Sequence, residues 1–426
     1  MQGILNKLAK FPRFRCRVEP VVAGKVNGKL KWVPTDISFE RHVTRYDDIK
    51  SKEELESIKN ELLVKPLQTD VPLFDVFVLS SSGGGGASSK SSGGESIKPV
   101  LAIRFSHAIS DGVHAVKVLE HVACGLDGEP VKMVHWKRSK KKKEFKNVFA
   151  MMLDFLYFIW VFMVGFCRAL FTAFGPADSK TVIRDEPVKW SGKREITTST
   201  PIALEELKAV RAAFKCTIND VIVSCIAGAV QRYMEERNCP FAKKPSARVR
   251  AIIPFATIPK KEMENMKNDP YSLRNLFTFV SLRLSMGTCS ATERLKRTIR
   301  KTYDLKRSPE AAVTIFLNAI TGKLGPTMQK QTVYDYMSRH SMVLTNVPGP
   351  IERVRLAGIE VETVDFACAN LINQVSALSY AGEIRLTLVT DPGIVKDAHI
   401  IAEYFLKEIK SLKIAADKVS SEAAAA

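Results

Sequence analysis

The residues with the most evident chemistry lie within Val100–Gly112, whose sequence is VLAIRFSHAISDG. The apolar run at its start predicts a buried strand that ends at Phe105, and His107 follows in the connection to the next element. An imidazole at the end of a strand, beside a cleft, is well placed to act as a general base. The pattern therefore makes His107 a candidate for proton transfer.

Asp111 and Gly112 stand at the start of the helix predicted at 113–124. The Asp111 carboxylate would lie across the turn from His107, where it could hold the backbone or pair with a buried arginine and so fix the loop. Gly112 would allow close packing where a side chain would clash. The competing interpretation is an N-cap aspartate beside an ordinary polar histidine. A metal pair is disfavoured, because His and Asp four residues apart share a face only on a continuous helix.

Two later motifs carry polar side chains at the ends of predicted elements. Thr217 and Asp220 form a capping box for an apolar helix, Ile218–Met234, and Asn219 lies between them. The segment Thr345–Pro350 reads TNVPGP and follows a strand. Its Pro-Gly pair predicts a type II turn, and the alternative is that Asn346 places an amide at the mouth of an active site.

The remaining elements predict a mixed α/β fold that would position these residues. Short apolar runs bounded by turn residues predict strands, and apolar residues at helical spacing predict helices. Strands are predicted at 71–79, 99–105, 248–255, 276–284, 341–345 and 382–390, and helices at 113–124, 204–214, 218–234, 293–304, 311–323 and 397–413.

Composition limits the classes of protein that remain. The chain has 426 residues, of which 46% are hydrophobic, so it can form two domains or two halves of one fold, and general disorder is excluded. Its 64 Lys and Arg against 45 Asp and Glu give a formal charge of +19, which favours an anionic partner. None of the eight cysteines has C-x-x-C spacing, which disfavours a zinc ribbon and favours reduced thiols on the cytosolic side.

Two segments depart from the globular pattern. Residues 80–96 are a Gly/Ser tract that predicts a flexible loop. Lys137–Lys146 holds seven basic residues and one acidic residue, and an apolar, aromatic-rich stretch follows it to Phe174. Only Asp154 and Arg168 are charged there, about 21 Å apart along a helix, whereas a bilayer core is about 30 Å thick.

We therefore favour a helix or short hairpin embedded in one leaflet or in a hydrophobic groove, with the lysines on anionic lipid. A true span and a plain core helix are the alternatives for the apolar stretch. A solvated loop and a nuclear-targeting patch are the alternatives for the basic run. Nucleic-acid binding is disfavoured, because the aromatic residues gather in an apolar block instead of alternating with basic ones.

Taken in order, several short motifs resemble those of the wax ester synthase/diacylglycerol acyltransferase family. The resemblance covers most of the chain, and the hydrophobic stretch is similar to that of plant-like members. The motifs are Phe11–Arg15, Lys65–Leu67, Pro72–Asp75, His107–Gly112, Asn219-Asp220, Ile253–Phe255 and Thr345–Pro350.

The resemblance implies two chloramphenicol-acetyltransferase-like halves, each with a mixed sheet and flanking helices. We expect an N-terminal half at 1–136, a membrane-associated segment at 137–178, a C-terminal half at 179–416 and a frayed tail at 417–426. A tunnel between the halves would admit acyl-CoA from one side and an alcohol from the other.

The resemblance also implies an activity: transfer of a long-chain acyl group from acyl-CoA to a fatty alcohol or diacylglycerol. His107 would be the base, with Asp111, Gly112 and Ser106 as motif support. Asn219, Asp220 and Asn346 would lie close to the active site, and Asn219 is a candidate donor to the oxyanion. Neither a cofactor nor a metal is expected. The protein would be membrane-associated on the cytosolic side, at the endoplasmic reticulum or plasma membrane.

The chain departs from the family at two motifs. Ser106 stands where members usually have the first of two histidines, and Arg274 stands where a glycine usually precedes Asn275. The second histidine of the pair is the one assigned as base, so His107 keeps that role. The alternative function is a catalytically impaired, membrane-tethered protein that binds acyl-CoA or lipid.

Overall fold

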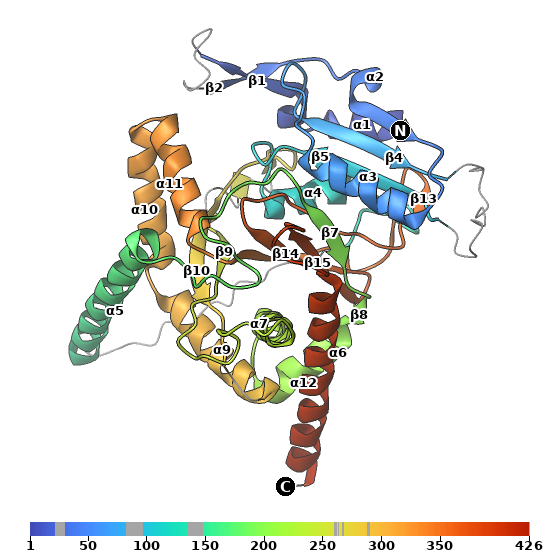
Figure 1. Ribbon diagram of the computed structural model, residues 1–426. Coiled ribbons are helices and arrows are strands. Elements are labelled where there is room, and N and C mark those ends of the chain that lie inside the picture. The colour runs from blue at the N-terminus through green and yellow to red at the C-terminus, as the bar shows by residue number, and fades with distance from the viewer. Residues whose placement is uncertain are drawn as a thin grey trace.

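The computed structural model describes residues 1–21, 30–81, 97–133, 148–259, 262, 264–265, 268–287 and 290–425. Most of the Gly/Ser tract and the whole Lys137–Lys146 run lie outside these residues, so the predictions for them stay predictions. Figure 1 shows a smaller N-terminal part above a larger C-terminal part, each with its own sheet.

The C-terminal half is built on a mixed sheet with the strand order β10-β9-β11-β14-β15-β7, and β8 pairs with β15. Strand β11 is parallel to both β9 and β14, and the other neighbours are antiparallel. The strands are β7 (Glu195–Thr198), β8 (Ile202–Ala203), β9 (Arg250–Ala256), β10 (Phe277–Arg283), β11 (Met342–Pro348), β14 (Asn373–Tyr380) and β15 (Glu383–Thr390).

One face of this sheet is covered by helices that surround α7 (Ile218–Glu236), which Figure 1 shows end-on. Most α7 side chains are buried, including Val221, Ile222 and Ile226. The predicted capping box is confirmed, because Thr217 Oγ1 accepts from Asp220 N and Asp220 Oδ2 accepts from Thr217 N. The surrounding helices are α6 (Leu204–Phe214), α9 (Ala291–Arg307) and α12 (His399–Ala425).

The N-terminal half also has a mixed sheet, in which β4 is parallel to β3 and antiparallel to β5. Its core forms where apolar residues of the first turns, such as Leu8 and Phe14, pack against Phe74 and Val76. Its elements are α1 (Gln2–Leu8), η1 (Pro12–Arg15), β1 (Cys16–Pro20), β2 (Leu30–Pro34), α2 (Phe39–His42), β3 (Val43–Tyr46), α3 (Lys52–Val64), β4 (Phe74–Leu79), β5 (Val100–Phe105) and α4 (Gly112–Val122).

The two halves exchange segments. Strand β6 (Cys124–Gly125) pairs with β12 (Val354–Leu356), which also pairs with β13 (Ile359–Glu360). Leu273 and Tyr271 belong to the C-terminal half in sequence but pack in the N-terminal core. The predicted α/β fold class with two mixed sheets is therefore confirmed, whereas the predicted domain bounds stay a prediction.

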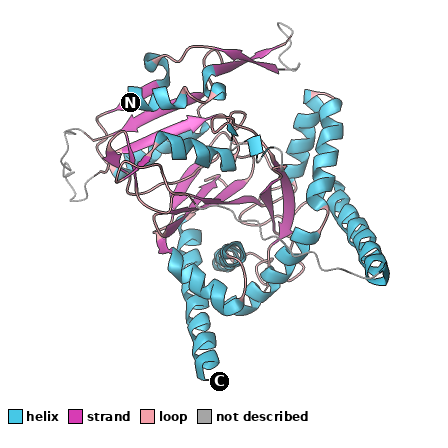
Figure 2. Cartoon of the chain, turned by 180° about the vertical axis from the view of Figure 1, so that it is seen from behind, coloured by secondary structure: helices cyan, strands magenta, loops and turns pink. Residues whose placement is uncertain are grey.

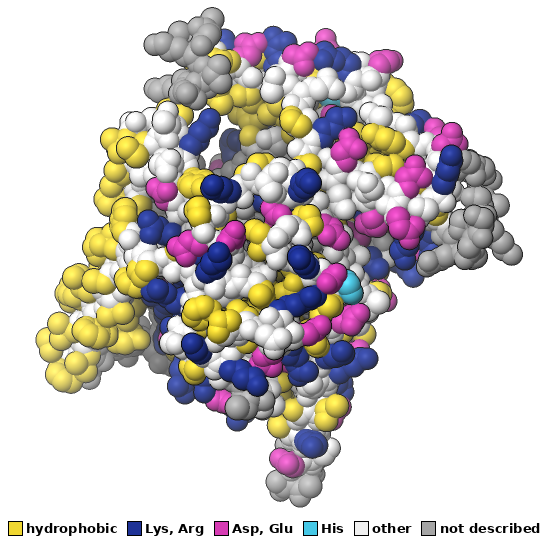
Figure 3. Space-filling model, viewed as in Figure 1, with side chains coloured by type: hydrophobic (Ala, Val, Ile, Leu, Met, Phe, Trp, Pro, Cys, Tyr) yellow, Lys and Arg dark blue, Asp and Glu magenta, His cyan; other side chains and the backbone are white. Residues whose placement is uncertain are grey.

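Three helices stand at one side of the molecule in both views (Figures 1 and 2). They are α5 (Val148–Phe174), α10 (Glu310–Lys323) and α11 (Pro326–Ser338). Within the described residues, only Met151–Thr172 in α5 forms a single helix long and apolar enough to cross a membrane. Of this apolar stretch, 17% is buried inside the protein. Figure 3 shows hydrophobic side chains along most of this helix. The bent pair α6 and α7 would count as another span only if taken together, and α7 lies in the core.

Three predictions about element ends were wrong. Strand β11 continues through Asn346 to Pro348 instead of ending in a type II turn, because pairing with β14 extends to Ser379 and Gly349 N donates to its carbonyl at 2.9 Å. Helix α4 ends at Val122, because Cys124 and the next residue pair in the sheet as β6.

The third correction concerns the C-terminal tail. Residues 417–425 are helical and continue α12 to Ala425 instead of fraying. Their Ala, Lys, Ser and Glu composition includes strong helix formers, and the last turns extend a helix already anchored in the core. The helix propensity of the tail residues therefore lengthens a helix that has already formed, without the cost of starting a new one.

Candidate functional site

His107 lies in a turn that directly follows β5, and its side chain is exposed. The imidazole packs against Phe277, the first residue of β10, with ring centroids 5.1 Å apart. Among the described residues, neither ring nitrogen has a hydrogen-bond partner. A general base needs one ring nitrogen without a proton and without another partner, and this arrangement meets that need.

The turn that carries His107 is held from both halves of the chain. Arg13 Nη1 donates to the carbonyl oxygens of Ala108 and Ile109, at 3.0 and 3.1 Å. Asn275 Nδ2 donates to the carbonyl oxygens of His107 and Ala108, at 2.7 and 3.1 Å. These four hydrogen bonds fix the backbone of the turn, so the imidazole projects from a defined position.

Asp111 is the N-cap of α4, as the competing interpretation had it, and it also binds backbone N–H groups, one of the two roles expected for its carboxylate. Its Oδ1 accepts from His114 N at 2.9 Å and from His114 Nδ1 at 2.7 Å, so it caps α4. Its Oδ2 accepts from Leu276 N at 2.8 Å, which ties the motif to the start of β10. The side chain thus hydrogen-bonds to His114 and to a backbone N–H, and Arg13 contacts the turn through the carbonyls described above. Burial raises the pKa of Asp111, but the hydrogen bonds from His114 and Leu276 lower it below its ordinary value overall.

Ser106 makes a hydrogen bond within the turn, whereas the fold does not require a glycine at position 112. Ser106 Oγ accepts from Ala108 N at 3.2 Å and so stabilises the turn. The expectation that only glycine fits at 112 was wrong. A Cβ placed there would meet Val347 at 3.8 Å, an ordinary van der Waals distance.

Asn219 and Asn346 are brought together from different elements. Asn346 in β11 donates through Nδ2 to Oδ1 of Asn219, in the first turn of α7. This hydrogen bond does not use the N–H donors of the Asn219 amide. Val347, the neighbour of Asn346 in β11, has the side chain nearest to Gly112 at the start of α4. Because successive side chains of a strand point to opposite faces, Asn346 and Val347 project from β11 in opposite directions, and the proximity of the amide pair to His107 stays a prediction.

Asp220 is buried and structural. Besides the capping box, its Oδ1 accepts from Thr302 Oγ1 at 2.5 Å and lies 3.8 Å from Lys306 Nζ. These contacts link α7 to α9. Among the described residues, Asp220 binds neither His107 nor Asn346, so its predicted proximity to the active site stays a prediction.

Sequence reasoning did not assign roles to Arg13, His114 or Phe277. Arg13 lies in the Phe11–Arg15 motif, which carried the family resemblance but no role. His114 is the third residue after the N-cap Asp111, a position whose side chain commonly reaches back to the cap. For Phe277 the only signal was its place at the start of a predicted strand.

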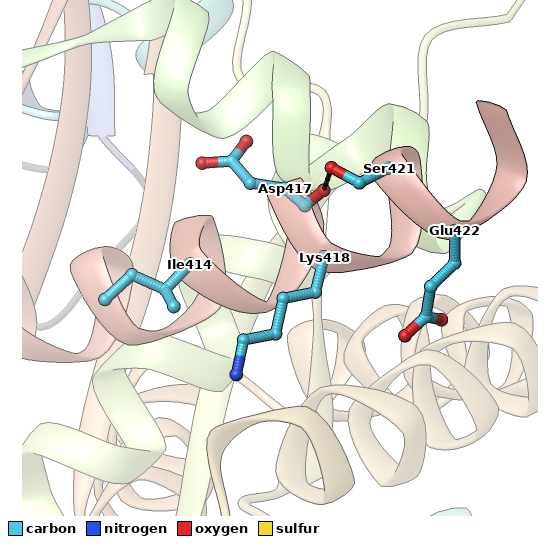
Figure 4. A pocket seen from close by; sticks show the side chains of 5 residues that line it. All are labelled: Ile414, Asp417, Lys418, Ser421 and Glu422. Carbon is cyan, nitrogen blue, oxygen red and sulfur yellow. Dashed lines mark hydrogen bonds between the residues drawn. The ribbon is translucent and has the colours of Figure 1, made fainter. Parts of the chain in front are cut away.

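The described hollows of the surface lie elsewhere. Figure 4 shows one on α12, lined by Ile414, Asp417, Lys418, Ser421 and Glu422. All five side chains come from one helix, so they cannot surround a ligand. The other hollow lies where residues 126–127 meet 351–353 and Ala381. Neither contains a predicted site residue, and the geometry around His107 is the stronger indication of a functional site.

The sequence matches a known family model. The model described as the WS/DGAT C-terminal domain matches residues 273–413. Wax ester synthase/diacylglycerol acyltransferase 5 of Arabidopsis thaliana is 22% identical, over 99% of this chain and 88% of that protein. Wax ester synthase/diacylglycerol acyltransferase 8 of Arabidopsis thaliana is 24% identical, over 97% of this chain and 89% of that protein.

Solved structures share the fold. The wax ester synthase/diacylglycerol acyltransferase from Marinobacter aquaeolei VT8 matches with a TM-score of 0.61 at 16% identity, over 98% of this chain and 90% of that chain. The starter condensation domain of rhizomide synthetase, solved in complex with C8-CoA, matches with a TM-score of 0.53 at 11% identity, over 98% and 85%. At these identities the structural likeness establishes the fold alone.

Proposed function

The chain belongs to the wax ester synthase/diacylglycerol acyltransferase family, a family of acyltransferases, and we propose that it transfers a long-chain acyl group from acyl-CoA to a fatty alcohol or a diacylglycerol. One observation carries the proposal: an exposed imidazole, that of His107, projects from a turn held by both halves. A base held in this way can meet two substrates that arrive between the halves.

In the proposed reaction, a ring nitrogen of His107 accepts the proton of the acceptor hydroxyl as its oxygen attacks the thioester carbonyl. The tetrahedral intermediate collapses with cleavage of the C–S bond, and the imidazolium returns the proton to the departing CoA sulfur. The products are an ester and free CoA. No covalent enzyme intermediate, cofactor or metal enters the proposed steps. A positioned base of this kind contributes roughly 10²–10⁴ in rate.

The oxyanion of the tetrahedral intermediate requires hydrogen-bond donors. Asn219 is the proposed donor, because its Oδ1 is bound by Asn346 while its N–H donors are not used in that bond. Asn346 acts as a positioning residue in this scheme. Asp111 and Ser106 support the turn and do not touch the substrate.

The test replaces His107 with alanine and measures ester formation from labelled palmitoyl-CoA with hexadecanol and with diolein. We expect activity to fall by about 10²–10⁴ with either acceptor. The matched control is His399→Ala, because His399 is also exposed but begins α12. Thermal unfolding checks that both variants are folded. Undiminished ester formation by a folded His107→Ala variant would refute the assignment of the base.

The same assay decides the alternative of a catalytically impaired lipid-binding protein. Ser106 in the place of a family histidine is the residue that raises it. If the unsubstituted protein binds acyl-CoA but forms no ester with any alcohol, the lipid-binding function replaces the proposed one.

We also propose that the protein is attached to an anionic membrane surface through the Lys137–Lys146 run and α5. Support comes from the sequence of the run and from the exposed apolar side chains of α5, such as Phe155, Phe158 and Trp160. Basic residues next to an apolar helix favour anionic lipid. The cytosolic face of the endoplasmic reticulum or plasma membrane is the proposed location.

A further inference from the structure

A second apolar surface lies on the hairpin formed by α10 and α11, which no sequence motif indicated. Phe316 and Leu324 on α10 are 60% and 64% exposed, and Ile320 beside them is 42% exposed. Met328 and Val333 on α11 are 47% and 42% exposed. Large apolar side chains gathered on an exposed hairpin indicate an interaction surface.

This hairpin is continuous with α5. A Cβ on Gly165 of α5 would lie 2.1 Å from Cδ of Pro309, at the start of α10, so the two backbones approach closely there. Nearby, Arg168 Nε lies 3.7 Å from the buried Glu310 carboxylate. Figure 3 shows hydrophobic side chains that extend from α5 over α10 and α11 on the same side of the molecule. We call α5, α10 and α11 together the docking surface.

The positive charge on this side of the molecule lies at the tip of the hairpin and on the helix that leads into it, whereas α5, α10 and α11 also hold one acidic residue each, Asp154, Glu310 and Asp335. Residues 311–334 contain no Asp or Glu, and their only charged residues are Lys323 and Lys330, both exposed and near the tip of the hairpin. Helix α9, which leads directly into α10, exposes Lys296, Arg297, Arg300, Lys306 and Arg307. Apolar side chains beside lysines and arginines match the acyl chains and anionic headgroups of a lipid bilayer.

A row of aromatic rings joins the docking surface to the candidate base. His107 packs on Phe277, and Phe277 packs on Phe279 of the same strand with centroids 5.3 Å apart. Phe279 stacks on Tyr336 of α11 at 6.2 Å. Residues 277 and 279 point to the same face of the sheet, since side chains alternate along a strand. A row of contacting aromatic side chains therefore runs along β10 from α11 to His107.

We propose that α10 and α11 dock on an anionic lipid bilayer together with α5, and that the acceptor lipid passes from this surface along β10 to His107. The second part rests on the proposed acyl transfer, whereas the first part does not. The hairpin thus serves as a second membrane contact besides α5 and defines the side of the molecule from which a lipid acceptor enters.

The test of docking uses Phe316→Glu with Leu324→Glu in the full chain. The matched control is Ile359→Glu with Ile414→Glu, two residues that are 70% and 60% exposed on β13 and α12. Binding is measured by flotation with vesicles of phosphatidylcholine and phosphatidylserine. Each substitution in the hairpin should lower the partition coefficient about tenfold, because burial of one such side chain in lipid is lost. The control should bind as the unsubstituted protein does. Unchanged binding of the hairpin variant would overturn the proposal, because α5 alone would then hold the membrane.

The test of lipid entry compares two acceptors with the same hairpin variant. Ester formation from diolein in vesicles should fall about as much as binding falls, and ester formation from a short water-soluble alcohol should stay unchanged. Equal activity on vesicle diolein despite weakened binding would overturn entry from this side. If the unsubstituted protein forms no ester at all, the proposed function fails, and flotation still decides membrane docking by the hairpin.

Discussion

Helices α5 and α7 are both long and apolar, yet the protein uses them in opposite ways. Helix α7 has 19 residues, and its buried set includes nearly every side chain from Asp220 to Gln231. Helix α5 has 27 residues, and only 17% of its most apolar stretch is buried. Helix α5 is the more apolar of the two, with two charged residues against four in the shorter α7, so burial follows from what covers each helix and not from hydrophobicity. Other helices and the sheet surround α7, whereas α5 contacts the rest of the chain mainly near its C-terminal half, at α10 and α11.

The polar residues around α7 show what burial in a protein requires. Glu408 of α12 accepts from Arg294 of α9 at 2.5 Å and from Arg232 of α7 at 2.7 Å. Gly228 makes room for this group, because a Cβ there would lie 2.4 Å from the Glu408 carboxyl carbon. Charged groups in the interior thus come with partners and with space. Residues 155–164 of α5 contain no charged residue at all.

The largest expected effect is on the buried carboxylate beside α7. Glu408→Ala leaves Arg294, which is itself buried, without its partner, and we expect the free energy of unfolding to fall by about 3–5 kcal/mol. Urea denaturation measures the loss. Glu403→Ala, at an exposed position of the same helix, is the control and should change stability by less than about 0.5 kcal/mol. Equal stability of the two variants would contradict the structural role of Glu408.

One substitution made in both helices sharpens the comparison directly. Ile222→Ala in α7 removes a fully buried side chain and should lower the free energy of unfolding by about 2–5 kcal/mol. Ile159→Ala in α5 removes a side chain that is 43% exposed and should cost under about 0.5 kcal/mol in the absence of membranes. Urea denaturation of both variants without lipid tests the pair. A cost at Ile159 comparable with that at Ile222 would mean that protein, not lipid, covers α5.

Sequence patterns predicted the features that depend on residues close together in the chain. The capping box at Thr217 and Asp220, the strand before His107 and the apolar helix α5 all follow from local spacing. The contacts that hold His107 do not, because Arg13 and Asn275 lie 95 and 168 residues away from their partners Ala108 and His107. Local preference also failed at Thr345–Pro350, where pairing with β14 overrides the turn that Pro-Gly favours.

The exposed hairpin shows a further limit. Helix α11 was not predicted, because Pro326–Ser338 mixes Gln, Thr and Lys with apolar residues and has no clear helical period. Its partner α10 was predicted as a helix, but exposure of Phe316 and Leu324 depends on what the fold leaves uncovered. Sequence therefore indicated one candidate membrane helix, and the tertiary structure adds the surface beside it.

The contact between α5 and α10 offers a smaller effect. Gly165→Ala places a Cβ 2.1 Å from the Pro309 ring, which must push the helices apart. We expect a cost of about 1–3 kcal/mol in the packing of α5, seen as faster hydrogen exchange in α5 and α10. Gly322→Ala in α10 is the matched control, since its nearest neighbour would be Gln329 at 3.9 Å. Alanine there should be neutral or stabilising by up to about 1 kcal/mol. Similar exchange in the two variants would show that α5 is not fixed at Gly165.

The smallest expected effect concerns the buried end of the surface that α11 exposes. His340 follows α11 and is fully buried, with Nε2 2.9 Å from Ser281 Oγ and Nδ1 2.7 Å from the Tyr336 carbonyl. Burial, and then the positive charge of Arg250, lower the pKa of His340 to about 3. In the unfolded chain the pKa is about 6.5, so only the unfolded state takes up a proton between these values. Stability is therefore full above pH 6.5 and falls as the pH drops below it.

Protonation of this single histidine in the unfolded chain should lower the free energy of unfolding by about 1.4 kcal/mol between pH 7.5 and pH 5.5. In His340→Gln that pH dependence should be absent, even if the variant is less stable at every pH, because all other titrating groups remain. Urea denaturation at the two pH values isolates the contribution as a difference between variant and unsubstituted protein. An identical pH dependence in both would mean that His340 takes up its proton as readily in the folded chain as in the unfolded one, and that the base of α11 is as open to water as its tip.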